Sequence, residues 1–483
     1  MSLAEQPADI LARLEKLREA DAPTHGGHVL SYVYDSGLAE LDELAAAAIR
    51  MVQPVNGLDP TTFTSVAVME GEVVAFARDL LGGDSEVVGS VTTGGTESCL
   101  LAVKTARDNF SGTGKPRLLA PVTVHAAFQK AAHYFGLELD LVPVLESGAV
   151  DADVLIAKMG PDVALVVVSA PSYPHAALDP IAAVAAAASA QGIDCHVDAC
   201  IGGWVLPFWS SLEPWDFTVP GVTSISADLH KFGYAPKGIS VLLQRGRDRQ
   251  RGQFFTTTRW PGYPVVNPTM LGSKSAGALA AGWAITHALG RDGMARLAES
   301  CERSTRALID VVASIEGLRV VGSPVGPLIA VATDDAAPAD RQVDPHHWAD
   351  QARAHGWLLQ LQPGLTQSDG TTLPHTTHLT ITPVTEAVLP ELSAALVTAA
   401  DEVRGVPAVS PEDVLAALPP GLPDGPLDSA TAFAILGAIG LVSSESGGLP
   451  DRMAPFLALV EALPAPLTER LLTEFIARVV EPR

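Results

Sequence analysis

Short apolar runs alternate with alanine-rich stretches through the middle of this 483-residue chain. The run 163–168 carries no charge and is rich in valine, which is typical of a strand buried on both faces of a parallel sheet. We expect a helix to follow, with Asp179 as its N-cap and Pro180 as its first residue, and then a second strand at 193–197. This strand–helix–strand unit predicts an open α/β sheet.

Residues that could bind a ligand or take part in catalysis lie directly after the predicted strands. In an open α/β sheet, ligands bind at the carboxyl ends of the strands, so these residues are expected to meet at one edge. The strands and the residues that follow them are 87–91 before Gly94-Gly95-Thr96, 118–124 before His125, 193–197 before Asp198, and 222–226 before Lys231. Four such placements in one chain are far less expected by chance than one.

Lys231 follows His230 in the stretch Ser-Ala-Asp-Leu-His-Lys-Phe-Gly at 226–233. An amine at the end of a rigid element can form an imine with the aldehyde of pyridoxal phosphate (PLP), a task that favours a lysine with a lowered pKa. A histidine–lysine pair alone is common, and a surface lysine is the simpler interpretation. The other three placements favour the cofactor.

Asp198 and His125 offer the groups that the ring of this cofactor needs. A carboxylate at 198 can keep the pyridine nitrogen protonated, which makes the ring an electron sink. Ala199 would give a small, flat contact to one face of the ring, and His125 could stack on the other face. Taken alone, Asp198 is equally well an ordinary loop acid, and for His125 a capping or half-buried histidine is the favoured interpretation.

The segment Thr93-Gly94-Gly95-Thr96 is expected to bind the cofactor phosphate. Two glycines let the backbone approach an anion, and Thr96 is expected to cap a helix whose N-terminal amides point outward. A lone Gly-Gly-Thr is otherwise only a turn. The segment has no G-x-G-x-x-G fingerprint, and no Gly-Lys-Ser/Thr follows it, which argues against NAD(P) and nucleoside triphosphates.

Five longer motifs make the chain similar to a known family. They are VTTGGTES at 91–98, HAAFQKAAHYFG at 125–136, HVDACIGGW at 196–204, SISADLHKFGYAPKG at 224–238 and PTMLGSKSAG at 268–277. These motifs resemble the group II PLP-dependent decarboxylase family, and most closely its sphingosine-1-phosphate lyase branch. The similarity runs in order from about residue 27 to about residue 289 and continues more weakly to about residue 404.

The resemblance implies an α/β structure of fold type I, the PLP-dependent transferase fold, and a homodimer with a shared active site. It also implies a role for each matching residue. Lys231 would be the Schiff-base lysine, Asp198 the partner of the ring nitrogen, and His125 the stacking residue. For the other matches, Gly94, Gly95, Thr96 and His230 would contact the phosphate, Ser273 would reach in from a partner subunit, Lys237 would assist chemistry or bind substrate, and Tyr34 would line the substrate site.

Several reactions stay open for such a site. A substrate amine would displace Lys231 from the cofactor, and the bond at Cα that stands perpendicular to the ring would break. Cleavage of the Cα–Cβ bond of a β-hydroxy amine gives an aldehyde lyase, which the resemblance favours, whereas loss of a carboxylate gives an amino-acid decarboxylase. A PLP-binding homologue without catalysis is a further hypothesis. An aminotransferase is disfavoured, because 376–383 has no arginine for a substrate carboxylate.

Loops that line the substrate in the lyase branch differ in this chain. The stretch Ser-Tyr-Pro-His-Ala at 172–176 replaces an Asn-Phe-Pro-Tyr-Gly-like turn, 260–267 replaces a Gly/Tyr-rich loop, and Lys274 replaces an arginine. A long-chain sphingoid phosphate is therefore not fixed as the substrate, which is an amine or an amino acid. Substrate contact and simple loop filling are equal alternatives for His28, Tyr173, His175 and Tyr263.

Four pieces are expected along the chain. They are an N-terminal arm at 1–58, a large PLP-binding domain at 59–290, a small C-terminal α+β domain at 291–405, and a helical extension at 406–483 behind a proline-rich break. The small domain is predicted from a helix at 294–315 and strands at 328–332 and 378–382, and the extension from apolar-periodic stretches at 430–441 and 467–480. The extension lies outside the resemblance. We expect the extension to consist of extra helices that pack on the small domain. The alternatives are that it covers the active site, contributes to assembly or forms a small appended module.

Composition agrees with an enzyme in solution. The formal charge of −24 speaks against binding to nucleic acid or to an anionic membrane surface. The four cysteines fit no zinc spacing and no disulfide framework, so we expect no metal, a reducing cytoplasm, and small buried apolar roles for them. No secretory signal and no transmembrane segment is expected, because the apolar runs are shorter than the roughly 20 residues that span a bilayer.

Overall fold

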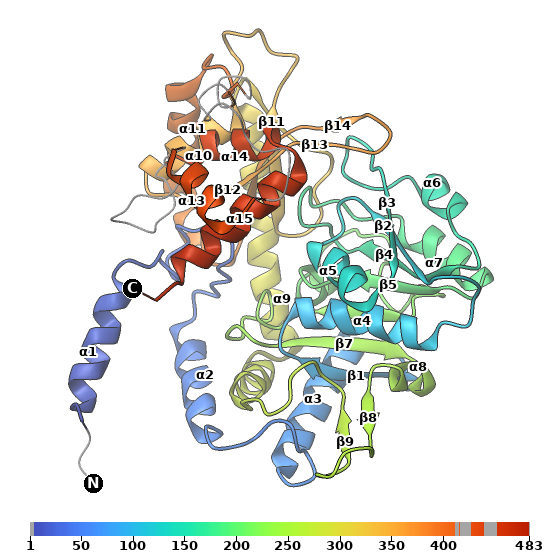
Figure 1. Cartoon of the computed structure of the whole chain (residues 1–483). Coiled ribbons are helices and arrows are strands. Elements are labelled where there is room, and N and C mark those ends of the chain that lie inside the picture. The colour runs from blue at the N-terminus through green and yellow to red at the C-terminus, as the bar shows by residue number, and fades with distance from the viewer. Residues whose placement is uncertain (1–3, 411–414, 416–426, 439–451, 483) are drawn as a thin grey trace.

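A seven-stranded sheet forms the centre of the computed structural model (Figure 1). Its strands are β1 (Val87–Thr92), β2 (Arg117–Pro121), β3 (Glu138–Val142), β4 (Val163–Ser169), β5 (Asp194–Asp198), β6 (Ser224–Ala227) and β7 (Ser240–Arg245). Their order across the sheet is β1-β7-β6-β5-β4-β2-β3. β7 is antiparallel to both neighbours, whereas the pairs among β2 to β6 are parallel. The predicted mostly parallel sheet is confirmed.

The structure describes residues 4–410, 415, 427–438 and 452–482. Most of the proline-rich break at the start of the extension lies outside these residues, as do positions 439–441 of the predicted stretch 430–441. Among the described helices, none combines the length and the apolar character that crossing a bilayer requires.

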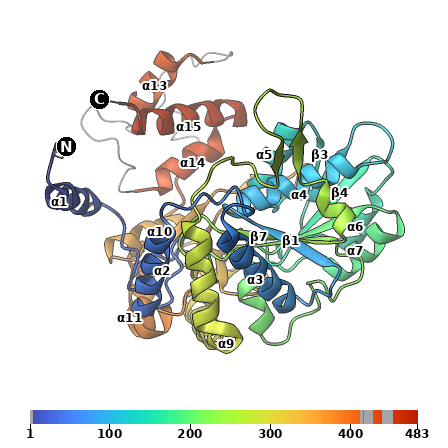
Figure 2. The same ribbon diagram turned by 90° about the horizontal axis from the view of Figure 1, so that it is seen from below.

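Helices cover both faces of the sheet because its inner strands are apolar on both sides. All seven residues of β4 are buried, and alternate side chains face opposite cores: Leu165 and Val167 one, Val166 and Val168 the other. The first core includes α4 (Gly95–Asn109) and α5 (Ala126–Phe135), and the second α3 (Thr64–Leu80), α6 (Ala152–Ala157) and α7 (Ile181–Ala190). Figure 2 shows α4 and α3 on opposite sides of β1 and β7.

The start of α7 differs from the prediction. Pro180, not Asp179, occupies the N-cap, and Asp179 is buried one residue earlier. Its carboxylate accepts hydrogen bonds from Ser169 N at 2.8 Å and Val150 N at 3.2 Å, so it joins the end of β4 to a neighbouring loop instead of capping the helix.

A long helix, α9 (Gly277–Ser314), follows the large sheet in the chain, and one helix of the N-terminal arm packs against it. α1 (Pro7–Arg18) contributes no buried residue, whereas α2 (Ala39–Met51) packs against α9. Gly290 interrupts α9 with a non-helical backbone (φ 56°, ψ −171°). The helix predicted at 294–315 is therefore the second half of a longer, kinked helix. The predicted domain limit at 290 coincides with this kink and stays a prediction.

A smaller antiparallel sheet follows, with the strand order β10-β11-β15-β12. Its strands are β10 (Leu318–Val320), β11 (Leu328–Thr333), β12 (Gln360–Gln362) and β15 (Thr376–Thr380), and it packs with α10 (Pro345–Ala354) and α11 (Thr385–Val403) around Trp348. Both strands that the sequence predicted in this region are present. Between β12 and β15, the strands β13 (Leu365–Thr366) and β14 (Thr372–Leu373) form a hairpin.

The extension forms α13 (Ser429–Ala438), α14 (Ala454–Ala462) and α15 (Ala465–Val479) around a small core of its own. α14 packs on α10 and β12, as the favoured interpretation of the extension expected. The remaining elements lie at the edges of the large sheet: α8 (Arg247–Arg251), the short helices η1 (Gly202–Trp204) and η2 (Leu206–Phe208), and the hairpin of β8 (Phe255–Thr257) and β9 (Val265–Asn267).

Candidate functional site

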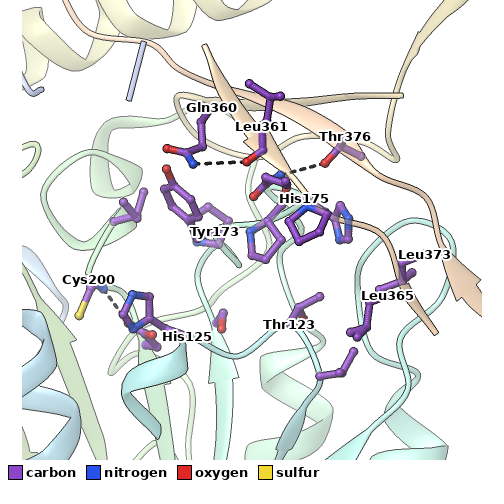
Figure 3. Close-up of a pocket in the computed structure, with 18 of the residues that line it drawn as sticks. Thr123, His125, Tyr173, His175, Cys200, Gln360, Leu361, Leu365, Leu373 and Thr376 are labelled. Carbon is purple, nitrogen blue, oxygen red and sulfur yellow. Dashed lines mark hydrogen bonds between the residues drawn. The ribbon is translucent and has the colours of Figure 1, made fainter. Parts of the chain in front are cut away.

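Two adjoining chambers lie beyond the carboxyl ends of the large sheet's strands. The first chamber has a volume of about 530 Å³ and the second about 560 Å³, and both are lined by His125, Cys200 and Lys231. The first chamber is closed on its far side by the small domain (Figure 3). The second chamber is lined by the glycine loop after β1. The sequence thus predicted correctly that residues following four strands meet at one edge.

The glycine loop needs both of its glycines. Gly94 has φ 145°, and a Cβ there would lie 3.1 Å from Cε1 of His230. A Cβ on Gly95 would lie 2.5 Å from Oδ2 of Asp228 and 2.8 Å from Sγ of Cys200. Any larger residue would therefore collide with the floor of the second chamber.

Thr96 does not cap α4, contrary to the expectation from the sequence. The N-cap is Gly94, and no side chain caps this end of the helix. Thr96 is an exposed residue of the first turn and lines the second chamber beside Gly94 and Gly95. Because no side-chain oxygen covers the first amides, the helix end is left open to an anion.

Glu97 holds the glycine loop in place, a role that no pattern in the sequence indicates. Its carboxylate accepts hydrogen bonds from Thr93 N at 2.6 Å, Thr93 Oγ1 at 2.7 Å and, on its other oxygen, Met270 N at 2.5 Å. It thereby joins the loop to the segment around Met270, whose side chain also lines the second chamber.

Lys231 forms a buried ion pair with Asp228, and Asp228 is the main residue that sequence reasoning missed. Nζ of Lys231 lies 3.1 Å from Oδ2 of Asp228, and Nε2 of His230 lies 3.4 Å from the same oxygen. Burial lowers the pKa of Lys231, but the carboxylate of Asp228 outweighs it and the net pKa is raised. The lowered pKa that the sequence predicted for Lys231 is therefore wrong. A carboxylate three residues before the lysine was the available signal.

His230 is the second partner of the Asp228 carboxylate. Its pKa is lowered by burial, against the opposing effect of Asp228, and its Nδ1 accepts a hydrogen bond from Ile239 N at 3.4 Å. The ring is therefore neutral with a proton on Nε2, which points to Asp228. His230 lines the second chamber together with Gly94 and Gly95. This position is compatible with its predicted contact with a phosphate, which stays a prediction.

Asp198 is the last residue of β5 and lines the first chamber with Lys231. Its Oδ1 accepts hydrogen bonds from Cys200 N at 3.1 Å and Ser226 Oγ at 3.4 Å, which fix the carboxylate in one orientation. Ala199 is fully buried and lines neither chamber. Cys200, which the sequence did not single out, lines both.

All four cysteines are buried and free, as expected. The side-chain ligand atoms of Cys99, Asp198 and Cys200 lie within 4.8 Å of one another. Burial raises the pKa of the Cys99 thiol, and the neighbouring Cys99 together with burial raises that of Cys200. Both thiols are therefore protonated at neutral pH, which makes them poor metal ligands.

His125 caps α5 and lines both chambers. Its Nδ1 accepts a hydrogen bond from Ala127 N at 3.2 Å, so Nδ1 carries no proton and the ring is directed by the helix that it caps. The two interpretations of this histidine from the sequence are thus compatible: it is a capping residue that also faces the cofactor chamber. Its stacking on a cofactor ring stays a prediction.

Tyr34 and Lys237 lie next to each other, although 203 positions separate them in the chain. Nζ of Lys237 lies 4.3 Å from the centre of the Tyr34 ring and donates to His230 O at 3.1 Å. Burial raises the pKa of Tyr34 to about 12. Burial, reinforced by the charge of Lys231, lowers the pKa of Lys237 to about 8. Tyr34 lines the first chamber and Lys237 the second.

The other sequence candidates divide into two groups. Tyr173 and His175 line the first chamber. The other three line neither chamber. His28 stacks on Trp357 of the small domain, and Tyr263 is exposed on the β8–β9 hairpin. Oγ of Ser273 accepts a hydrogen bond from Asn56 Nδ2 at 3.3 Å. The predicted role of Ser273 concerns a partner subunit and stays a prediction.

The far wall of the first chamber comes from residues 360–376, here called the roof segment. Gln362 Nε2 donates to Pro174 O of the large domain at 2.8 Å and to Thr376 Oγ1 at 2.9 Å. Figure 3 shows Gln360, Leu361 and Thr376 across the chamber from His125. Because this wall lies far along the chain from every motif, the sequence offered no signal for it.

The described residues fit PLP. The open N-terminus of α4, with its two indispensable glycines and His230, suits a phosphate. Lys231 stands between the two chambers, where an aldehyde carbon would lie, and the fixed carboxylate of Asp198 faces the same space. The roles of single residues in holding the cofactor stay predictions.

Two family models match the chain. One, described as "Pyridoxal-dependent decarboxylase conserved domain", matches residues 55–330. The other, described as "Pyridoxal-dependent enzyme, C-terminal putative HTH domain", matches residues 412–478, which lie within the extension. Both descriptions specify pyridoxal, and PLP is therefore the cofactor of this site.

Similar curated proteins are sphingosine-1-phosphate lyases. That of Dictyostelium discoideum is 36% identical over 335 residues, 68% of this chain and 63% of that protein, and that of Rattus norvegicus is 35% identical over 357 residues, 72% of this chain and 61% of that protein. The match thus spans about three fifths of the length of these relatives.

Among solved structures, a sphingosine-1-phosphate lyase from Burkholderia pseudomallei is 31% identical with a TM-score of 0.76, covering 84% of this chain and 93% of its own. A glutamate decarboxylase from Lactobacillus brevis has a TM-score of 0.72 at 18% identity, covering 85% and 96%. The latter shows the shared fold alone. Together these likenesses confirm the predicted fold type I architecture.

Proposed function

The chain belongs to the pyridoxal-dependent decarboxylase family, and from that premise we propose that it is a carbon–carbon lyase that cleaves the Cα–Cβ bond of a long-chain β-hydroxy amine. The products would be a long-chain aldehyde and a shorter amine. The similarity to sphingosine-1-phosphate lyases supports a phosphorylated sphingoid base as the first substrate to test. Decarboxylation of an amino acid is the alternative.

The wall of the first chamber carries this proposal. Among the described lining residues, Lys231 is the only lysine or arginine, and burial lowers the pKa of His175 to about 4, which leaves it neutral. A substrate α-carboxylate would therefore lack a cation of its own in this chamber, and an unpaired charge there is costly. An alkyl chain gains instead, because each buried methylene contributes about 0.8 kcal/mol. The chamber's leucines, prolines and tyrosines suit such a chain.

The side chains divide the chemical work. When bound, PLP supplies an electron sink for the electron pair of the bond that breaks at Cα. Asp198 keeps the positive charge of the ring nitrogen next to a fixed carboxylate, and Lys231 supplies the amine that a substrate replaces. The ring of His125, held by its hydrogen bond from Ala127 N of α5, would limit the movement of a group bound where the two chambers meet.

Cleavage also needs two proton movements. The β-hydroxyl loses its proton as Cβ becomes the aldehyde carbon, and Cα gains a proton before the shorter amine leaves. Lys237, with a pKa of about 8, can accept the first proton near neutral pH, whereas Tyr34, with a pKa of about 12, stays protonated and can donate a hydrogen bond.

We further propose that the working unit is a homodimer. The β8–β9 hairpin and the segment behind it expose six large apolar side chains beside the second chamber: Phe255, Trp260, Tyr263, Val266, Met270 and Leu271. A patch of this kind favours a protein partner. A second copy seated there would bring Ser273 toward a site, as the family resemblance implies. Sedimentation of the holoenzyme as a monomer at micromolar concentration would contradict it.

The reaction is tested with purified holoenzyme and a substrate panel. Sphingosine 1-phosphate and a set of free amino acids are supplied separately, and products are identified by mass spectrometry. We expect a long-chain aldehyde and phosphoethanolamine from the first, with no release by the Lys231→Ala variant. Release of CO2 with formation of an amine from an amino acid would favour the decarboxylase. A full cofactor absorbance without turnover of any amine would favour a non-catalytic PLP-binding protein.

A further inference from the structure

The extension is attached to the small domain through both ends of α14. No side chain of its own caps the first turn of this helix. Asp350 of α10 takes that place: its two carboxylate oxygens accept from Met453 N at 2.8 Å and Ala454 N at 3.0 Å. A carboxylate satisfies free amides at a helix N-terminus and is favoured by the helix dipole. This contact fixes the start of α14 on α10.

The other end of α14 reaches the wall of the first chamber. Oε1 of Glu461, near the C-terminus of the helix, accepts a hydrogen bond from Gly364 N at 2.9 Å. Gly364 belongs to the roof segment and lines the chamber together with Pro363 and Leu365. Figure 1 shows α14 beside α10 and close to β12, in agreement with their contacts. The helix therefore spans from a capping carboxylate to the chamber roof.

The roof segment is otherwise held from the side of the large domain. Gln367 is buried, and its amide makes two hydrogen bonds to Val144: Oε1 accepts from Val144 N at 2.8 Å, and Nε2 donates to Val144 O at 3.0 Å. Gln362 makes the contact with Pro174 described above. The two glutamines thus attach the roof segment to the large domain, and Glu461 attaches it to the extension at Gly364.

The charge of the extension argues against a second use as a nucleic-acid reader, which a helix-turn-helix would suggest. Residues 412–478 contain nine acidic and three basic residues. Two of the three basic residues, Arg470 and Arg478, are ion-paired to Glu474 at 2.9 and 2.8 Å. Binding to DNA depends on free basic side chains that neutralise phosphates, and α15 does not present them.

We infer that the extension is a brace for the substrate chamber, in which α14 holds the roof segment in place and Glu461 is a positioning residue. This inference rests on the proposed function only in taking the first chamber as the substrate site. It does not depend on which bond the enzyme breaks.

Hydrogen–deuterium exchange on the full-length holoenzyme tests the brace without any substrate. In Glu461→Ala we expect peptides within 363–374 to exchange roughly fivefold to tenfold faster, the effect of losing one hydrogen bond. Glu461→Gln keeps an oxygen that can accept from Gly364 N and should restore slow exchange. Asp350→Ala, which frees the other end of α14, should act like Glu461→Ala. The control is Glu469→Ala, a change of an exposed side chain on α15, which should leave these peptides unchanged.

Steady-state kinetics give the functional measure with whichever amine the holoenzyme converts. A positioning role predicts that Glu461→Ala raises KM several-fold while kcat and the cofactor absorbance stay close to those of the parent, and that Glu461→Gln reverses the change. If no amine is converted, the proposed reaction fails while the exchange result still decides the brace.

Two results would overturn the inference. One is unchanged exchange of 363–374 in both Glu461→Ala and Asp350→Ala. The other is binding of duplex DNA at about 0.15 M salt that the Arg470→Ala and Arg478→Ala variants abolish, because the extension would then serve a nucleic acid.

Discussion

The floor and the roof of the first chamber are held by different kinds of contact. The floor consists of strand ends of the large domain and centres on the buried ion pair of Lys231 and Asp228. The roof is a short hairpin that neutral amides, those of Gln362 and Gln367, hold on the large domain, with Glu461 of the extension as a further contact at Gly364. Breaking a buried ion pair costs about 3–5 kcal/mol, whereas losing one neutral hydrogen bond costs about 1 kcal/mol. The floor should therefore tolerate little change, while the roof is the place where substrate preference can vary.

The largest effect is expected at Lys231. Because Lys231→Ala removes the amine that binds the cofactor covalently, we expect activity to fall by at least about a thousandfold. Borohydride reduction followed by peptide mass spectrometry should find the PLP adduct on residue 231 of the parent and none in the variant. Lys237→Ala, which removes a neighbouring amine, should keep the adduct. An adduct that persists in Lys231→Ala would place the covalent link elsewhere.

The second test breaks the ion pair but keeps the lysine. Asp228 raises the pKa of Lys231, so Asp228→Asn lowers it and increases the fraction of free amine at a given pH. We expect cofactor capture, followed by absorbance, to shift to lower pH by about one unit or more, a tenfold change at fixed pH.

Asp194→Asn is the matched control for that test. Asp194 is a partly buried carboxylate that, like Asp228, has a cationic partner, Arg249 at 3.0 Å, but it is the first residue of β5 and lies away from the carboxyl ends of the strands. It should leave the pH of cofactor capture unchanged. An equal shift in both variants would mean that Asp228 acts only through overall charge or stability.

A change in the roof should separate substrate binding from cofactor binding. Gln362→Ala removes the hydrogen bonds to Pro174 and Thr376, and we expect KM to rise about fivefold to tenfold while the cofactor spectrum stays the same. Gln351→Ala, a change of a half-buried glutamine on α10 that donates to Glu402, serves as control. A loss of cofactor from Gln362→Ala would show that floor and roof are not independent.

The smallest effect is expected in the pH dependence of turnover. The pKa of Lys237 is lowered to about 8, so its free amine rises from about a tenth to about half of the molecules between pH 7 and pH 8. If Lys237 is the base, kcat rises about fivefold over this interval. Residual turnover of Lys237→Met should lack this rise. An unchanged rise in the variant would assign the proton transfer to another group.

The residues of the floor could be predicted largely from sequence, and the two failures of that prediction have physical reasons. Asp198, His125 and Lys231 lie where the strand pattern placed them, because a parallel sheet brings the carboxyl ends of its strands to one edge. The sequence predicts Thr96 as the cap of α4, but Gly94 occupies the N-cap, since the glycine's backbone angles are not visible in a sequence. Asp228 was overlooked although it lies three residues before Lys231.

The sequence by itself determined the alternation of strands and helices and the placement of the glycine loop, His125, Asp198 and Lys231 near the strand ends, because local patterns and chain order fix these features. The tertiary structure alone decided the roof, the brace and the electrostatics of Lys231. Gln362, Gln367 and Glu461 carry no local signal; each acquires its role only when the small domain and the extension pack over the large sheet. A charge in the chain likewise gains its pKa only from the neighbours that folding supplies.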